Sequence, residues 1–238
     1  PNLWVAGGSG THTLAKSTDG INWTGLGNSI FTVGCNGIAW NGTLWVAVGY
    51  GTNSIATSLD GNTWIGRSNI IFSGGSYGVD WNGSLWVTVG NGSTYKIATS
   101  PDGINWTGRA TSSLFLVGNS IAWNGSMWVA VGEGTSNTIA TSPDGIIWTG
   151  RGSPISTYGY GIAWNGSIWI AVGEGTSNTI ATSPDGINWT GRGSTIFSGY
   201  GHGIAWNGSL WVAVGDGSNT IATSPDGIIW TGRGSPIS

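Results

Sequence analysis

Three features of the sequence predict an all-β fold that is built from a tandem repeat. The chain has 238 residues, of which 45 are Gly and 17 are Trp, whereas charged residues make up only 7%. A seven-residue phrase of the form Ser-x-Asp-Gly-x-x-Trp recurs along the chain, and short apolar segments such as "LWVAVG" alternate with turn residues. Short apolar runs separated by glycine-rich turns are typical of β-proteins, and no segment places apolar residues at the spacing of a helix.

The repeat extends over the whole chain. The Asp of the phrase recurs at spacings of 41, 42, 42, 41 and 41 residues, and three Trp series with the same period account for all 17 tryptophans. A fixed period of this length indicates a repeat architecture rather than a chain of unrelated segments. The aspartates of the phrase are Asp19, Asp60, Asp102, Asp144, Asp185 and Asp226.

Each repeat is predicted to form four short antiparallel strands, as the last repeat illustrates. Residues 203–206 ("GIAW") form the first strand, 210–215 ("LWVAVG") the second, 220–224 ("TIATS") the third and 228–232 ("IIWTG") the fourth. The Asn-Gly between the first two strands supplies the two positive-φ positions of a type I′ turn. The Asp-Gly of the phrase turns the chain between the third and fourth strands. The second strand is apolar on both faces, so we expect it to be covered on both sides.

Four antiparallel strands with a period near 41 residues match the blade of a β-propeller, for which about 40–50 residues per repeat is usual. We therefore predict an all-β fold, a six-bladed β-propeller, as a single domain over residues 1–238. The first blade has no counterpart of "GIAW", so its innermost strand is expected to come from flanking sequence or from a partner chain. The blade repeats are expected at residues 1–33, 34–74, 75–116, 117–157, 158–198 and 199–238.

The recurring phrase resembles the Asp-box, or BNR repeat, whose pattern is Ser/Thr-x-Asp, an optional residue, and Gly-x-Thr-Trp. This sequence keeps the Thr only as Thr63 and has Asn or Ile there in the other repeats. The resemblance covers nearly the whole chain. It implies a β-propeller whose boxes join the third and fourth strands on the rim away from the ligand face. Because the family includes sialidases, other glycosidases, lectin-like propellers and assembly factors, it implies no single activity.

The acidic residues do not predict catalysis. Glycosidases need two carboxylates that face each other across the substrate, and the sialidases of the Asp-box family also use three arginines and a Tyr nucleophile. Six of the ten acidic residues are box aspartates, which we assign to turns. Glu133, Glu174 and Asp216 share one repeat position, whereas an active site would be asymmetric. The protein is therefore expected not to be an enzyme, and a glycosidase-like activity is the less favoured alternative.

Other common partners and cofactors are also not expected. The seven Lys and Arg are spread along a chain of net charge −3, which lacks the basic patch of a nucleic-acid-binding protein. His12 and His202 have no metal-ligand company in the sequence, and the lone Cys35 is expected to be a small buried residue. No apolar run approaches the about 18–20 residues of a membrane helix. We expect no metal, no cofactor, no nucleic acid and no membrane insertion.

The loops opposite the boxes are the candidate binding surface. Polar loops such as "EGTSN" follow the second strand, and Tyr or His recurs two residues before the Ile or Val of the first strand. Carboxylates, amides and aromatic rings suit sugars, and repeated weak sites add avidity. The hypothesis is an extracellular or particle-associated, multivalent glycan-binding module. The alternative is a structural or protein-interaction scaffold, such as a spike, fibre or surface component, in which these loops only form a soluble edge. The candidate ligand residues are Glu133, Glu174, Asp216, Asn137, Asn178, Asn219, Tyr77, Tyr160, Tyr200 and His202.

Overall fold

The structure, a computed structural model, describes residues 3–111 and 113–236. Residues 1–2, 112 and 237–238, which include both predicted ends of the repeat array, lie outside the described residues. In the described part all regular structure is β-strand, as predicted. The chain divides into two compact units, Pro1–Ser112 and Ser113–Ser238, and a single domain remains a prediction.

A search of the described residues for a helix long and apolar enough to cross a membrane finds none.

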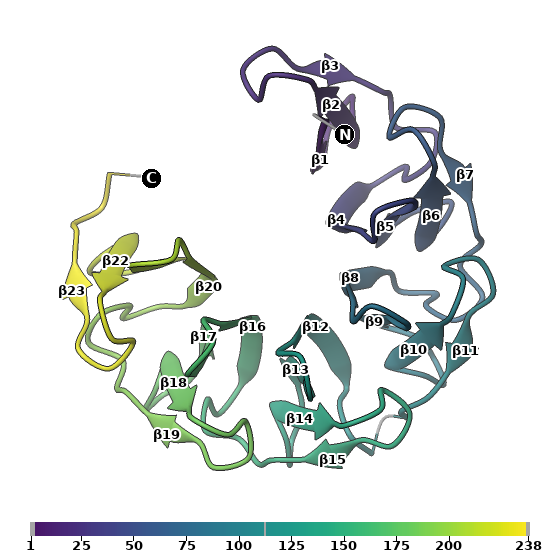
Figure 1. Ribbon diagram of the computed structural model, residues 1–238. Helices are drawn as coiled ribbons and strands as arrows, with labels where there is room; N and C mark the ends of the chain where they lie inside the picture. Colours follow the sequence, from purple (N-terminus) through teal and green to yellow (C-terminus); the bar gives the residue numbers. More distant parts are fainter. Residues whose placement is uncertain (1–2, 112, 237–238) are drawn as a thin grey trace. The chain divides into compact units, whose positions relative to one another are not determined.

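Unit 1 (Pro1–Ser112) contains the first three repeats, each an antiparallel meander (Figure 1). The first repeat forms a three-stranded sheet in the order β1-β2-β3, and the next two repeats form four-stranded sheets. The first strands of the second and third repeats, β4 and β8, contact each other. The strands are β1 (Trp4–Gly7), β2 (Leu14–Ser17), β3 (Thr24–Gly25), β4 (Gly34–Trp40), β5 (Trp45–Tyr50), β6 (Ile55–Ser58), β7 (Ile65–Gly66), β8 (Ser76–Trp81), β9 (Trp86–Gly90), β10 (Ile97–Ser100) and β11 (Thr107–Gly108).

Unit 2 (Ser113–Ser238) contains the last three repeats, each with four strands (Figure 1). A bridge between Glu133 and Tyr158 joins the fourth and fifth repeats into one sheet. The first strand β16 of the fifth repeat contacts both β12 and β20. The strands are β12 (Val117–Trp123), β13 (Trp128–Glu133), β14 (Ile139–Ser142), β15 (Thr149–Gly150), β16 (Tyr158–Trp164), β17 (Trp169–Glu174), β18 (Ile180–Ser183), β19 (Thr190–Gly191), β20 (Gly201–Trp206), β21 (Trp211–Gly215), β22 (Ile221–Ser224) and β23 (Thr231–Gly232).

The fourth strand of each repeat is shorter than predicted. In the last repeat the sequence predicts a strand over residues 228–232, but β23 contains only Thr231 and Gly232. The reason lies in the preceding turn, where the amides of Ile228 and Ile229 donate to Asp226 Oδ1 at 2.8 and 2.9 Å. These N–H groups are therefore not available to the third strand, and pairing starts only after them.

The turn between the first and second strands is not the predicted type I′ turn. That turn needs positive φ at both central residues, but in the last repeat only Gly208 has one, at 98°. Asn207 instead uses its side chain: Oδ1 accepts the amides of Ser209 and Leu210 at 2.9 and 2.8 Å. Asn therefore recurs at this position because its side chain mimics a backbone acceptor, and not because it adopts a left-handed conformation.

The second strands form the core of each unit, as their apolar sequence predicts. In unit 2, β13 and β17 are buried apart from their terminal Glu, and a cluster of Val129, Ile162 and Trp169 packs between them. Trp169 is fully buried and its ring centroid lies 5.1 Å from that of Trp164. The same Trp pair recurs in the second, third, fourth and sixth repeats, so each four-stranded repeat carries a large aromatic anchor.

Candidate functional site

The box aspartates act within their own turns. Asp185 Oδ1 accepts hydrogen bonds from the hydroxyl of Ser183 and from the amides of Ile187 and Asn188, at 2.9, 2.8 and 2.8 Å. Its Oδ2 accepts the side-chain amide of Asn188 at 2.7 Å. These donors, the backbone amide of Asn188 first, hold the pKa of the carboxyl well below its usual value. The carboxylate is thus committed to closing the turn.

The arginines that follow the fourth strand are also structural. In the fifth repeat, Arg192 Nε donates to Thr182 Oγ1 at 2.8 Å and links the third strand to the end of the fourth. Four further repeats contain the same pair. A contact repeated in this way braces the sheet edge and does not distinguish one repeat as a site.

A β-bulge presents one side chain from each first strand. In β16 the register shifts between Gly159 and Gly161, so Tyr160 has no partner on the neighbouring strand. Bulges bend a strand and re-aim a side chain, and they are frequent beside functional sites. The equivalent bulged residues are Asn36, Tyr77, Asn119, Tyr160 and His202.

Bulged asparagines and bulged aromatic residues do different things. Asn36 Nδ2 donates to the carbonyl of Ser76, and Asn119 Nδ2 donates to the carbonyl of Gly159, each at 2.9 Å. Both asparagines therefore tie one repeat to the next. Tyr77, a candidate ligand residue, donates its hydroxyl to the carbonyl of Gly74 at 3.1 Å.

In unit 2, aromatic rings gather where the fifth and sixth repeats meet. We define the aromatic cluster as Tyr158, Tyr160, Tyr200 and His202. The rings of Tyr158 and Tyr160 stack at 5.6 Å with 12° between their planes, and Tyr200 meets Tyr160 edge-on at 6.4 Å and 81°. His202 lies 5.7 Å from Tyr160 and 5.9 Å from Tyr200. Tyr200 is 39% exposed, so the cluster is open to a ligand.

Carboxylates alternate with two of these tyrosines across the three repeats of unit 2. Tyr158 pairs with Glu133 on one side and with Glu174 on the other. Glu174 is bridged to Tyr200, whose carbonyl accepts the amide of Asp216 at 2.7 Å. We call this sequence of neighbours, Glu133, Tyr158, Glu174, Tyr200 and Asp216, the carboxylate–tyrosine row. Its members project from the ends of the first and second strands.

Burial and a neighbouring carboxylate set the protonation of the central tyrosine of the cluster. Burial comes first among the causes that raise the pKa of Tyr160 to about 12, and the negative charge of Glu174 comes second. The ionised forms of Tyr158 and Tyr200 at high pH and a hydrogen bond to Glu174 add to the shift. The Tyr160 hydroxyl therefore remains protonated and is a donor at neutral pH. His202 Nε2 and Asp216 Oδ2 lie 2.8 Å apart, and both side chains are about half exposed, at 50% and 52%.

The candidate asparagines lie in the same loops but serve the fold. Asn178 Nδ2 donates to the carbonyl of Pro154 at 3.1 Å, and its Oδ1 accepts the amide of Gly193 at 2.9 Å. Asn219 makes the same two kinds of contact, and Asn137 Oδ1 accepts the amide of Gly152 at 3.0 Å. Because these amides are occupied, they cross-link neighbouring loops.

Sequence reasoning overlooked Tyr158, which stacks on Tyr160 and completes the row. A signal was present, since Tyr158 and Tyr200 occupy the same position two residues before a bulged aromatic residue. The repeats of unit 1 hold Gly34 and Gly75 at that position, so they lack the row.

Residues suggestive of other chemistry do not gather into a site. Cys35 is buried, as expected, and burial raises the pKa of its thiol to about 12. His12 Nδ1 accepts the amide of Gly27 at 2.8 Å. In residues 3–111 and 113–236 no three His, Cys, Asp or Glu side chains lie close enough to hold a metal ion.

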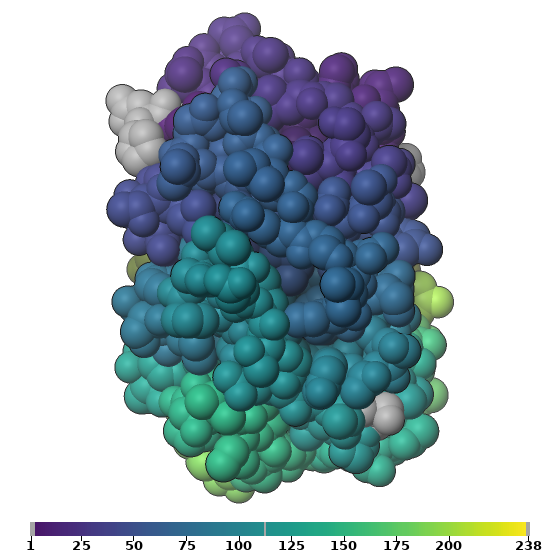
Figure 2. Space-filling view, turned by 90° about the vertical axis from the view of Figure 1, so that its right-hand side faces the viewer, coloured from purple at the N-terminus to yellow at the C-terminus, as the bar shows by residue number. Residues whose placement is uncertain are grey.

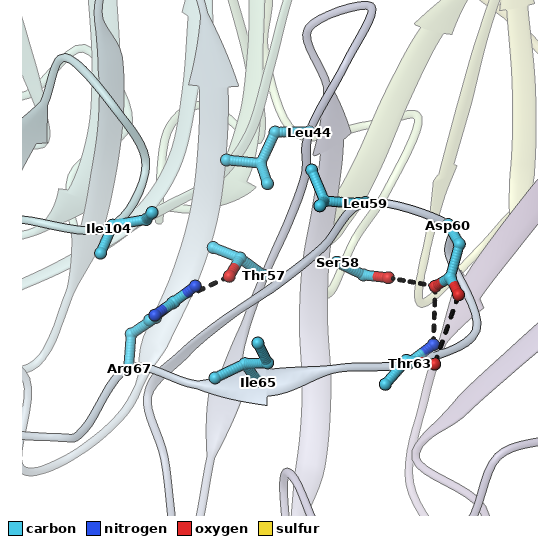
Figure 3. Close-up of a pocket in the computed structure, with 9 residues that line it drawn as sticks. All are labelled: Leu44, Thr57, Ser58, Leu59, Asp60, Thr63, Ile65, Arg67 and Ile104. Atoms are coloured by element: carbon cyan, nitrogen blue, oxygen red, sulfur yellow. Dashed lines mark hydrogen bonds between the residues drawn. The ribbon is translucent and has the colours of Figure 1, made fainter.

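Unit 1 contains a cavity of about 300 Å³ beside the box of the second repeat (Figure 3). The surface over the second and third repeats, drawn in blue, faces the viewer in Figure 2. Leu44, Leu59, Ile65 and Ile104 give the cavity apolar walls, and Arg67 lies at one end.

Comparison with known proteins supports the fold but identifies no family. No protein-family model matches the chain, and no curated protein matches its sequence. A chain in the crystal structure of a nidogen/laminin complex is similar with a TM-score of 0.69 at 12% identity, over 98% of this chain and 93% of that chain. The crystal structure of the computationally designed Ika8 protein is similar with a TM-score of 0.60 at 11% identity, over 95% of this chain and 69% of that chain.

At such low identities the similarity shows the fold alone. Together with the antiparallel meanders of both units, it confirms the coarser part of the fold prediction. The chain has an all-β, β-propeller-like fold with repeated strand units.

Proposed function

We propose that the protein is a non-catalytic β-propeller module that binds saccharides through the aromatic cluster and the carboxylate–tyrosine row of unit 2. The observation that carries the proposal is the meeting of stacked tyrosines with carboxylates at an open surface. The site draws on six of the candidate residues, together with the unforeseen Tyr158. The six are Tyr160, Tyr200, His202, Glu133, Glu174 and Asp216.

The chemistry of this surface suits sugars. Tyrosine rings offer broad, rigid apolar faces at a low cost in conformational entropy, and each has a polar hydroxyl at its tip. The C–H face of a pyranose can lie on such a ring while its hydroxyls donate to carboxylates. In this arrangement Tyr160 and Tyr200 supply two perpendicular walls, and Glu174 lies beside both of them.

The charge of the row restricts the class of saccharide. The row contributes Glu133, Glu174 and Asp216, and the one basic member of the aromatic cluster, His202, is paired with Asp216. A sugar acid would be repelled by these carboxylates, since like charges at short range are unfavourable. We therefore expect a neutral or amine-bearing saccharide.

The row also changes the expected mode of binding. The sequence suggests one weak site in each repeat, but the aromatic and acidic groups concentrate in unit 2 and are linked from strand to strand. A saccharide chain of several rings would lie along the row and contact more than one repeat. Affinity should therefore rise with the number of sugar units.

Binding without catalysis is the simpler use of these carboxylates. Glycoside hydrolysis needs an acid and a base or nucleophile on opposite sides of one bond. Here the three carboxylates occupy one repeat position at the ends of the second strands, and Asp216 is paired with His202. A regular row of this kind suits repeated hydrogen bonding better than a two-sided reaction.

A glycan array followed by calorimetry tests the proposal. Tyr160→Ala and Tyr200→Ala should each weaken binding about tenfold or more, as expected for a central aromatic contact. Tyr50→Ala is the matched control, because Tyr50 is exposed to a similar extent, at 43% against 39% for Tyr200, but lies in unit 1. Absence of binding to any neutral or amine-bearing saccharide would refute the proposal.

The proposal includes the finer fold assignment, an Asp-box propeller of six blades. Two observations support this assignment: the turn geometry of the boxes, and the open edge of the sheet in the first repeat. In the described residues β1 pairs only with β2, and Trp4 is 60% exposed whereas the equivalent Trp86 is fully buried. A strand of the "GIAW" type from flanking sequence or a partner chain would complete this sheet and cover Trp4.

A protein-interaction scaffold is the second candidate, and one observation favours it. Box turns expose aliphatic side chains, with Ile21 81%, Ile147 71% and Ile229 69% exposed. Apolar surface of this kind marks interaction sites when it is contiguous. The low charge and abundant Trp fit a rigid extracellular or particle-associated protein under either proposal. A triple variant with Ile21, Ile147 and Ile229 changed to Ser removes this apolar surface. If the variant still binds saccharides, saccharide binding does not depend on the exposed isoleucines, and the two functions are separate.

A further inference from the structure

The second repeat departs from the others at two positions beside its box. Leu59 stands where the other repeats have Pro or Thr, and Ile65 stands where every other repeat has Thr. The equivalent residues in the other repeats are Thr18, Pro101, Pro143, Pro184 and Pro225 for Leu59, and Thr24, Thr107, Thr149, Thr190 and Thr231 for Ile65. Both changes enlarge the aliphatic surface beside this box.

The two departures line the same cavity in unit 1. Leu59 and Ile65 form its walls together with Leu44 from the preceding turn and Ile104 from the third repeat (Figure 3). Leu59 is 77% exposed and Ile65 is 55% exposed, so both present apolar surface to solvent. Exposed aliphatic groups that converge on one hollow are typical of a ligand site rather than of scattered surface residues.

A cation lies at one end of this apolar hollow. Arg67 Nε donates to Thr57 Oγ1 at 2.8 Å, which holds the guanidinium against the wall. Within the described residues the guanidinium makes no other hydrogen bond, so its Nη groups can bind an anion. Asp60 lies at the opposite end in Figure 3, and its carboxylate is held by Ser58 and by the amide and hydroxyl of Thr63.

A strained residue follows Arg67 directly. Ser68 has φ of 81°, the one positive φ at a non-glycine among the described residues. Gly occupies this position in the first, fourth, fifth and sixth repeats, for example Gly193 with φ of 84°. Strain of this kind persists where the surroundings hold it and is concentrated at functional sites. The third repeat has Ala110 here, so among the described residues only the second repeat keeps the positive φ without Gly, next to Arg67.

From these observations we infer that the cavity of the second repeat binds an aliphatic monocarboxylate. The alkyl chain lies between Leu59, Ile65 and Ile104, and the carboxylate pairs with the free Nη groups of Arg67. The same Arg–Thr pair occurs in other repeats, as in Arg192 with Thr182, but without the two apolar walls. Among the described residues this combination of apolar walls and an Arg–Thr pair occurs once, within unit 1, and it shares no residue with the saccharide site of unit 2.

The first experiment measures binding of straight-chain carboxylates from butanoate to decanoate by chemical-shift titration of the isotope-labelled chain. Each added methylene should strengthen binding about fourfold until the cavity is full, as expected for burial of a methylene group. Octanoate should bind at least tenfold more tightly than octanol or octylamine, which lack the anion. The shifts should be largest at Leu59, Ile65 and Ile104.

Variants that restore the repeat consensus provide the matched control. Leu59→Pro with Ile65→Thr introduces only residues that the other repeats hold at these positions, so the fold should be kept, which thermal unfolding verifies. This double variant should weaken octanoate binding at least tenfold and abolish the dependence on chain length. Arg67→Gln should remove the preference for octanoate over octanol.

A graft provides the converse test. Pro184→Leu with Thr190→Ile places both apolar side chains in the fifth repeat, where Ile168, Arg192 and Ile228 already match the positions of Leu44, Arg67 and Ile104. The grafted chain should bind two equivalents of octanoate. Failure of octanoate to bind the natural chain, or equal binding to the consensus variant, would overturn the inference.

Discussion

Replacing Asp185 with Ala should loosen the turn between β18 and β19 while leaving saccharide binding unchanged. The carboxylate accepts four hydrogen bonds at 2.7–2.9 Å, one from Ser183, one from Ile187 and two from Asn188. The variant removes all four acceptor contacts at once. It leaves the aromatic cluster untouched, because none of these donors belongs to it.

The magnitude follows from the exposure of the turn. A net intramolecular hydrogen bond contributes about 0.5–1.5 kcal/mol, and bonds to a charged group somewhat more. Asp185 and its donors Ile187 and Asn188 are exposed, however, so solvent replaces most of each lost bond. We expect the free energy of unfolding to fall by about 1–2 kcal/mol, less than the simple sum of four bonds.

Two assays read this change at different scales. Urea unfolding followed by Trp fluorescence measures the overall loss of stability, and amide hydrogen exchange at Ile187 and Asn188 measures the opening of the turn itself. Asp144→Ala is the matched control, since Ile147 supplies only its backbone amide and Asp144 lacks the side-chain bond that Asn188 gives Asp185. Its cost should be smaller, and Asn188→Ala should account for the difference.

The division between turn and site would be wrong under one clear result. If Asp185→Ala abolished saccharide binding while amide exchange at Ile187 and stability to urea stayed the same, the box would belong to the ligand site. Equal losses of stability in the Asp185 and Asp144 variants would refute the assignment of the side-chain bond.

Three further predictions concern the backbone, pH and the thiol. Gly186→Ala should cost about 2 kcal/mol or more in thermal unfolding, because its φ is 72° and a Cβ would displace Met127 Cε, 2.5 Å away, and crowd the fully buried Trp169, whose Nε1 lies 3.2 Å away. Gly166→Ala, with φ of 100° and no heavy atom within 4 Å, should cost only about 1–2 kcal/mol. The pKa of Asp60 is lowered from 3.8 to about 2, first by the amide of Thr63. The stability that this carboxylate contributes is therefore complete above pH 3.8 and should be lost as the pH falls through about 2, which acid unfolding measures. The loss of stability with pH should be less steep in Asp60→Asn. Cys35, whose pKa is raised to about 12 by burial, should not react with a thiol reagent at pH 8 until urea unfolds the chain; rapid reaction in the folded state would show that it is accessible.

Much of the candidate site could be anticipated from the sequence, but its composition could not. Glu174, Asp216, Tyr160, Tyr200 and His202 stand at recurring loop positions, and the structure brings all of them together. Sequence position alone could not separate them from Asn178 and its equivalents, because an amide in a loop can face a ligand or bond the backbone. That choice depends on which acceptors the neighbouring loop presents.

The repeat phase, the order of the strands and the purpose of the boxes follow from the sequence by itself. They depend on local chemistry. A Ser-x-Asp-Gly turn closes on its own amides, as Asp185 shows, and an apolar run such as "LWVAV" at residues 44–48 forms a strand whose interior is buried. Local rules also led to two errors, the type I′ turn and the length of the fourth strand. In both places a side-chain acceptor, Asn207 or Asp226, takes amides that propensity assigns to the backbone.

Only the tertiary structure decided which loops form one surface. Tyr158 meets Glu133 and Glu174, and Tyr200 meets Glu174, because neighbouring repeats place the ends of their first and second strands side by side. The bulge at Tyr160 is equally a product of strand pairing, since it exists only where two strands differ by one residue. Contacts between repeats about 41 residues apart in the chain depend on how the sheets pack, and no local pattern specifies that packing.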